Sequence, residues 1–126
     1  MGKRMGYLID SNILIYHLNE QHDASAFLKT HSHESAISLI TYIEVLSFPM
    51  SDNEEKYVRQ LLSKFKVINP DQVVAEKAVE NRKVKKIKIP DNIIAASAMV
   101  NNLTLVTRNT KDFETLNLQL VNPFDV

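Results

Sequence analysis

Four acids in this chain each stand beside the end of an expected strand or the start of an expected helix. They are Asp10, Glu44, Asp91 and Asp112. Carboxylate oxygens are the ligands that hard divalent cations such as Mg²⁺ and Mn²⁺ prefer. Such a cation can polarise a phosphate group and lower the pKa of an attacking water. If the fold brings the four side chains together, they can support metal-assisted cleavage of a phosphodiester bond.

Each acid taken alone also has a structural interpretation. Asp91 and Asp112 fit first-turn acids, which the helix dipole favours, and Asp10 fits a residue that simply ends a strand. Thr41-x-x-Glu44 has the form of a capping box, in which the glutamate satisfies a backbone N–H at the helix start. The sequence leaves these alternatives open.

The four acids gain meaning as a group. Asp91 lines up with Ile94 and Ala95 on the apolar stripe of its helix, so its carboxylate is expected to point along the protein. Two carboxylates about 4 Å apart repel by roughly 4 kcal/mol at an effective dielectric of about 20. Several such pairs would strain a domain whose whole stability is on the order of 5–15 kcal/mol. A convergent acidic group therefore predicts a cation among its members.

The elements that must position these acids alternate between short β-like runs and helical patterns. The expected strands are Tyr7–Ile9, Ser35–Ile40, Val67–Ile68, Leu103–Thr107 and Leu118–Val121. The expected helices with both ends given are Ile13–Leu18, Asp23–Lys29, Thr41–Phe48 and Pro90–Val100. A further helix is opened by the capping box Ser51-x-x-Glu54, and a short one is expected at Thr110. Asp71 is expected to cap another helix, whose inner face carries Val74, Ala75, Ala78 and Val79.

Strands separated by helices predict an α/β fold with a mostly parallel sheet covered on both faces. Sites in such sheets form beyond the carboxyl ends of the strands, which is where Asp10 and Asp112 are expected. A chain of 126 residues fits one domain, residues 1–126.

The composition excludes several classes of site. The chain has no cysteine, which rules out disulfides, thiolate zinc sites and cysteine nucleophiles. With only two glycines, it has no phosphate-cradling glycine loop. Fifteen basic residues balance fifteen acidic ones, so net charge predicts no class of partner. No apolar run is long enough for a membrane span, and we expect a cytoplasmic protein.

Three segments carry a resemblance to a known family. YLIDSNILIY resembles the first strand and helix of PIN-domain nucleases, and SLITYIEVL resembles the segment with their glutamate. IPDNIIAASAMVNNLTLVTRNTKDF is similar to their most specific stretch, with an Asp, an alanine-rich helix, a strand and Thr-x-Asn-x-x-Asp-Phe. The resemblance runs from about Tyr7 to Pro123 and is greatest to VapC-type toxins of prokaryotic toxin–antitoxin pairs.

This resemblance implies a three-layer PIN-like fold with a central parallel sheet of about five strands flanked by helices. It also implies an endoribonuclease that depends on Mg²⁺ or Mn²⁺, a homodimer, and inhibition by a cognate antitoxin. The four acids occupy the family's acidic positions, where they would hold metal. Asn12, Thr107 and Asn109 match its supporting polar residues, and Ser11 departs mildly from the commoner threonine.

A basic run stands directly before Asp91. Its members are Arg82, Lys83, Lys85, Lys86 and Lys88. A charge run is often only a solvated loop, but its position suggests that it holds the RNA backbone beside the acids.

Two other classes of function compete with the nuclease. A phosphoryl-handling α/β domain of the haloacid-dehalogenase type needs a second aspartate two residues after Asp10, where this chain has Asn12. A receiver domain needs paired acids after the first strand, and Asp10 has no acidic neighbour. A non-catalytic RNA- or protein-binding module remains open, because only a measured activity can exclude it.

Overall fold

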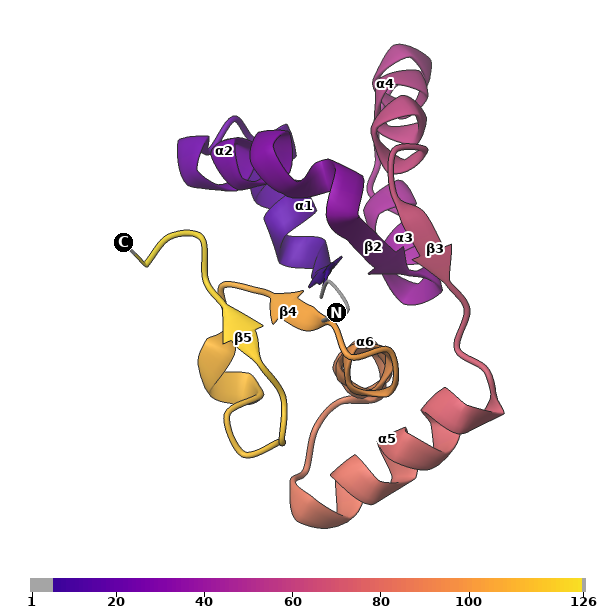
Figure 1. Ribbon diagram of the computed structural model, residues 1–126. Coiled ribbons are helices and arrows are strands. Elements are labelled where there is room, and N and C mark those ends of the chain that lie inside the picture. The colour runs from indigo at the N-terminus through magenta and orange to yellow at the C-terminus, as the bar shows by residue number, and fades with distance from the viewer. Residues whose placement is uncertain (1–5, 126) are drawn as a thin grey trace.

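The computed structural model describes residues 6–125, which contain a five-stranded sheet (Figure 1). All four strand pairings are parallel, and the strand order is β3-β2-β1-β4-β5. The strands are β1 (Tyr7–Ile9), β2 (Ser35–Ser38), β3 (Lys66–Ile68), β4 (Thr104–Val106) and β5 (Leu120–Val121). The predicted α/β class and the five parallel strands are confirmed.

Helices cover both faces of this sheet, as Figure 1 shows. The α-helices are α1 (Ser11–Leu18), α2 (His22–His31), α3 (Leu39–Leu46), α4 (Asp52–Leu62), α5 (Gln72–Val84) and α6 (Ile89–Val100). Two short 3-10 helices are η1 (Ser32–Glu34) and η2 (Thr110–Asp112). No helix within residues 6–125 is long and apolar enough to cross a membrane.

The core is split between the two faces because side chains alternate along each strand. Ile9 of β1 and Val106 of β4 pack with α1 to α4 on one face. Their neighbours Leu8 and Leu105 pack with α6 on the other face. The central strand β1 is thus buried on both faces. Asp10, which directly follows it, is buried as well.

Three helix ends follow the predicted local signals, whereas α1 begins at Ser11 rather than Ile13 and Gln21 rather than Asp23 precedes α2. Ser51 and Glu54 form the reciprocal capping box at the start of α4. Asp71 caps α5 by accepting from the Val74 N–H at 3.0 Å. Asn102 follows α6 with a φ of 54°, the left-handed conformation that an asparagine tolerates well.

The predicted capping box at Thr41-x-x-Glu44 is wrong. Helix α3 begins at Leu39, and Ser38 is its cap, with a hydroxyl that accepts from the Ile40 N–H at 3.1 Å. Strand β2 ends earlier than expected, so the helix starts two residues sooner. Glu44 is therefore inside the helix, where its carboxylate is available for other partners.

The inner face of α5 also differs from the prediction. Val74 is buried, but Val79 is 51% exposed, and the stripe continues through Ala78 to the buried Asn81. The Asn81 amide donates to Asn92 Oδ1 at 3.0 Å, and the Asn92 amide donates to the Ala78 carbonyl at 2.8 Å. Because α5 packs against α6, a polar pair replaces the apolar residues that the periodicity favoured.

Candidate active site

Three carboxylates from separate segments line one cavity of about 510 Å³, called here the acidic cavity. Asp10 directly follows β1, Glu44 is in α3, and Asp91 is in the first turn of α6. The other lining residues are Ser11, Asn12, Ile15, Ile43, Ser47, Phe48 and Asn109. None of these lining residues carries a positive charge. The fold therefore brings three of the four predicted acids to one place.

Asp10 is the most buried of these acids, at 6% exposed, and its carboxylate is held from three directions. The Thr107 hydroxyl donates to Asp10 Oδ2 at 2.8 Å, and the Asn12 amide reaches the same oxygen at 3.4 Å. The backbone N–H of Ser11 donates to Oδ1 at 2.7 Å. Thr107 follows β4, so the pairing of β4 with β1 delivers this contact.

Burial raises the pKa of Asp10 from 3.8 to about 6. The hydrogen bonds from Thr107 and Ser11 oppose this rise, and the negative charges of Asp91 and Glu44 add to it. Residues 6–125 offer Asp10 no cationic partner. The carboxylate is therefore costly to ionise in the folded chain, and a bound cation would remove that cost.

Glu44 is oriented by the residue that follows Asp10. The Ser11 hydroxyl donates to Glu44 Oε1 at 2.5 Å and lies 3.0 Å from the Thr41 hydroxyl. This role of Ser11 was not predicted from the sequence. Its only signal was a hydroxyl directly after Asp10, and the partner is 33 residues away in the chain.

Asp91 is partly buried, and burial is the main reason that its pKa lies above the usual value of 3.8. The negative charges of Glu44 and Asp112 raise it further, whereas the positive charge of Lys88 lowers it. Asp91 therefore shares an electrostatic environment with the other acids and with the end of the basic run.

Asp112 lies apart from the other three. It is exposed in η2 and does not line the acidic cavity. Its negative charge nevertheless helps to raise the pKa of Asp91. The backbone of η2 is held by Lys85, whose Nζ donates to the carbonyls of Asp112 at 2.5 Å and Lys111 at 3.3 Å. This structural role of Lys85 could not be predicted from the sequence, because both acceptors are backbone atoms.

The polar residues Thr107 and Asn109 support one another. The Asn109 N–H donates to the Thr107 hydroxyl at 3.1 Å, and its carbonyl accepts from the Asp112 N–H at 3.1 Å. The side chain of Thr107 contacts the first acid, Asp10, and the backbone of Asn109 starts η2. This short segment thus connects the two ends of the acidic group.

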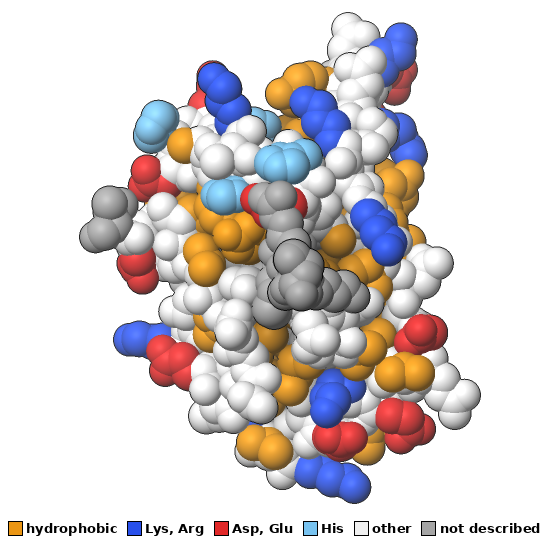
Figure 2. All heavy atoms as spheres, in the orientation of Figure 1, with side chains coloured by type: hydrophobic (Ala, Val, Ile, Leu, Met, Phe, Trp, Pro, Cys, Tyr) orange, Lys and Arg blue, Asp and Glu red, His pale blue; other side chains and the backbone are white. Residues whose placement is uncertain are grey.

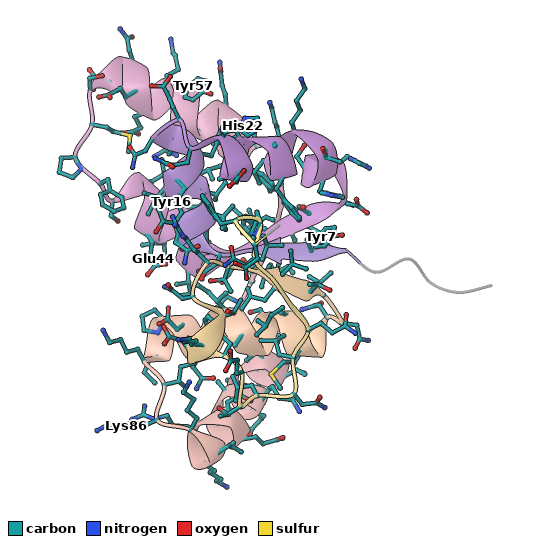
Figure 3. All side chains as sticks on the ribbon, turned by 90° about the vertical axis from the view of Figure 1, so that its left-hand side faces the viewer. Tyr7, Tyr16, His22, Glu44, Tyr57 and Lys86 are labelled. Atoms are coloured by element: carbon teal, nitrogen blue, oxygen red, sulfur yellow. The ribbon has the colours of Figure 1, made fainter. Side chains whose placement is uncertain are left out.

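The residues of the basic run lie in different elements and have different contacts. Arg82 and Lys83 are in the last turn of α5, and Lys86 extends outward from the α5–α6 connection (Figure 3). Lys85 is used by η2, and Lys88 lies close enough to Asp91 to lower its pKa. On the face in Figure 2, Lys and Arg side chains are scattered among acids. Contact of these residues with RNA stays a prediction.

Residues 7–117 match the family model of the PIN domain. The chain belongs to the PIN-domain family. Ribonuclease VapC10 of Mycobacterium tuberculosis is 32% identical, over 94% of this chain and 93% of the relative. Within the PIN-domain family, the chain is therefore of the VapC type.

Two solved structures extend this comparison. A toxin–antitoxin complex from Klebsiella pneumoniae matches with a TM-score of 0.86 and 39% identity, over 96% of this chain and 100% of that chain. VapBC2 from Rickettsia felis, bound to a DNA fragment from their promoter, matches with a TM-score of 0.79 and 27% identity. That match covers 94% of this chain and 98% of that chain. The predicted PIN-like fold is confirmed.

The donor set of this PIN domain fits a hard divalent cation. The acidic cavity offers carboxylate and amide oxygens and no sulfur or imidazole. Within residues 6–125, no three acids or histidines are grouped closely enough to hold a metal ion by themselves. Mg²⁺ usually keeps several waters and binds through one or two carboxylates, so water can complete the coordination that these side chains begin.

Proposed function

We propose that this PIN domain, residues 1–126, is an endoribonuclease that cleaves RNA phosphodiester bonds with Mg²⁺ or Mn²⁺, and the toxin of a toxin–antitoxin pair. The carrying observation is the acidic cavity, which three carboxylates line without a cationic side chain. Its buried member Asp10 has a pKa of about 6, which favours occupancy by a cation. The similarity to ribonuclease VapC10 supports RNA as the substrate.

In this proposal Asp10 and Asp91 hold the metal most directly, and Glu44 and Asp112 are further ligands, directly or through water. When bound, the ion supplies positive charge to the phosphate and lowers the pKa of water. Thr107 and Asn12 fix Asp10 Oδ2 by hydrogen bonds at 2.8 and 3.4 Å. Such outer contacts orient ligands.

Glu44 has two possible tasks in the reaction. Its Oε1 atom accepts from Ser11, which fixes the direction of the carboxylate toward the acidic cavity. From there Glu44 either completes the metal site or takes the proton of the attacking water. The second task requires Oε2 to lie within hydrogen-bond reach of that water.

We also propose a cognate antitoxin as partner, a homodimer as the assembled state, and a cytoplasmic location with the RNA. The Klebsiella relative in a toxin–antitoxin complex supports the first of these. An apolar cavity of about 550 Å³ between α1 and α4 offers a surface for it, beside the exposed rings of Phe48 and Tyr57. Size-exclusion chromatography with light scattering, with and without the antitoxin, tests both assemblies.

The deciding experiment incubates purified, partner-free protein with total RNA in Mg²⁺ or Mn²⁺, beside an EDTA control. Asp91→Asn is compared with Asp52→Asn, because both acids stand in a first helical turn but Asp52 is in α4, outside the acidic cavity. We expect discrete cleavage that needs metal and disappears only in Asp91→Asn. Intact RNA in every lane, from folded and metal-loaded protein, would favour a non-catalytic binding module instead.

A further inference from the structure

Arg108 does not line the acidic cavity, but both of its neighbours in the chain belong to the candidate site. Thr107 before it binds Asp10, and Asn109 after it lines the cavity. The Arg108 N–H also points at Asn12 Oδ1, at 3.5 Å. The backbone of Arg108 is therefore fixed relative to the acids, although its side chain is exposed.

Two aromatic rings hold the Arg108 side chain. Its guanidinium carbon lies 4.9 Å from the centroid of the Tyr16 ring and 4.1 Å from that of Phe124. The two rings contact each other edge to face, at 5.3 Å and 68°. Cation–π contacts of this kind restrict the side chain before any ligand binds, so little rotamer freedom remains to be lost.

The two rings come from segments with fixed positions. Tyr16 is in α1, one residue after Ile15, which lines the acidic cavity (Figure 3). Phe124 follows β5 in a turn closed by its own N–H, which donates to Asn122 Oδ1 at 2.9 Å. Figure 1 shows this C-terminal segment running from β5 toward α1 and α2. The contact between Tyr16, Arg108 and Phe124 could not be predicted from their spacing in the sequence.

The hydrogen-bonding capacity of Arg108 is largely unused by residues 6–125. A guanidinium carries five N–H donors in a planar fork, and none of them donates to a described residue. Within the same residues, no carboxylate forms an ion pair with Arg108. An oriented fork of this kind matches the geometry of a phosphate group.

The negative charge of the acidic cavity is a reason for a cationic side chain to bind RNA near it. Three carboxylates line the cavity, and a nucleic acid strand brings one negative charge per phosphate to it. A metal ion can offset the charge at the bond that is cut, but the neighbouring phosphates need their own positive partners. Arg108 can offer such a charge, because its backbone N–H lies 3.5 Å from Asn12 Oδ1 and its neighbour Asn109 lines the cavity.

We propose that Arg108, held between Tyr16 and Phe124, binds the RNA phosphate next to the one that is cut, which makes it a substrate-positioning residue. This inference rests on the proposed ribonuclease function and adds to it a subsite for a flanking phosphate. Tyr16 and Phe124 act through Arg108 by orienting its guanidinium.

The test uses a short single-stranded RNA that the wild-type protein cleaves, with each linkage replaced in turn by an uncharged methylphosphonate. In the wild type, one linkage beside the cut site raises KM about tenfold when neutralised, with kcat changed by less than about twofold. Arg108→Ala raises KM on the unmodified RNA to a similar extent. The methylphosphonate at that linkage then has no further effect in Arg108→Ala, because both changes remove the same contact.

Two milder variants and one control separate this contact from a loss of folding. Arg108→Lys keeps the charge without the fork, and Phe124→Leu keeps the arginine but removes a ring, so both raise KM by less than Arg108→Ala. Arg59→Ala removes an exposed arginine of α4 that also touches a tyrosine, through Tyr42 Oη at 2.9 Å. It leaves KM and the methylphosphonate profile unchanged.

Each failure has its own signature. Equal sensitivity of wild type and Arg108→Ala at every linkage would overturn the phosphate subsite while leaving the nuclease intact. A fall in kcat with unchanged KM would also overturn it, since that pattern indicates a disturbed Asp10 rather than lost RNA binding. The proposal also fails if Arg108→Ala stays sensitive to every methylphosphonate but is no longer sensitive to removal of one base. That result would mean that Arg108 contacts a base rather than a phosphate. If wild-type protein cleaves no RNA, the proposed function itself fails and this inference with it.

Discussion

Asp10 and Asp112 belong to the same candidate site but are positioned by opposite means. Asp10 is 6% exposed, follows the central strand, and receives hydrogen bonds from three residues at its carboxylate. Asp112 is exposed in a single 3-10 turn, and Lys85 holds its backbone carbonyl rather than its carboxylate. Contacts in the core thus fix the carboxylate of Asp10, whereas a contact at the surface fixes only the backbone of Asp112.

This difference first predicts unequal losses of cleavage. Asp10→Asn removes a charge that the fold directs into the acidic cavity, so we expect activity to fall on the order of 10³-fold. Asp112→Asn removes a charge outside the cavity and should cost only about tenfold. Cleavage rates at saturating Mn²⁺ measure both. Equal losses would mean that Asp112 moves into the cavity when metal or RNA binds.

The support around Asp10 predicts a loss of metal affinity at Thr107. Thr107→Val keeps the shape but removes the 2.8 Å hydrogen bond to Asp10, which should weaken Mn²⁺ binding about 10- to 100-fold. Thr104→Val is the matched control, because its hydroxyl contacts Gln119 at the other end of β4. Calorimetric titration measures both variants. Similar affinities would show that Asp10 needs no orienting partner.

The buried end of the site should also carry a cost in stability. The folded chain raises the pKa of Asp10 from 3.8 to about 6, so the folded state binds the proton more tightly than the unfolded state. In metal-free protein, stability from this group is greatest below about pH 4 and falls as pH rises through about 6, by at most about 3 kcal/mol. We expect Asp10→Asn in EDTA to be about 1–3 kcal/mol more stable than wild type at pH 7.

Urea unfolding of wild type, Asp10→Asn and the exposed control Asp112→Asn at pH 5 and pH 7 measures this effect. The advantage of Asp10→Asn should shrink at pH 5, where wild-type Asp10 is largely protonated. An Asp10→Asn variant less stable than wild type at pH 7 would mean that its hydrogen bonds outweigh the cost of burial.

The surface end predicts the smallest effect, at Lys85. Lys85→Met frees the carbonyls of Lys111 and Asp112, and we expect kcat to fall about three- to tenfold with little change in KM. Lys86→Met removes a neighbouring exposed charge and should raise KM instead. Steady-state cleavage of one RNA measures both. A rise in KM for both variants would return Lys85 to the RNA-binding surface.

The sequence predicted the strands and the region of the acids because those features are local. A period of two or of 3.6 residues identifies an element, and parallel pairing then places the ends of β1 and β4 at one edge. The partners of Ser11 and Lys85 depended instead on contacts across about 30 residues, for which no local pattern exists.

The errors have a similar cause. Thr41-x-x-Glu44 has the sequence of a capping box, but Ser38 caps the helix about one turn earlier. Thr41 and Glu44 therefore lie inside the helix. The inner face of α5 was chosen by hydrophobicity, whereas the pairing of Asn81 with Asn92 decided which side faces α6. Such polar partners are settled only when two helices have packed.

The pairing of β4 with β1 also bears on when the protein becomes active during its synthesis. Asp10 is made 97 residues before Thr107, whose hydroxyl donates to its carboxylate and which follows β4. Until β4 has been made, β1 can pair only with β2. We therefore expect the acidic cavity to form only after β4 and Thr107 have left the ribosome, so that a shorter growing chain does not cut the RNA that surrounds it.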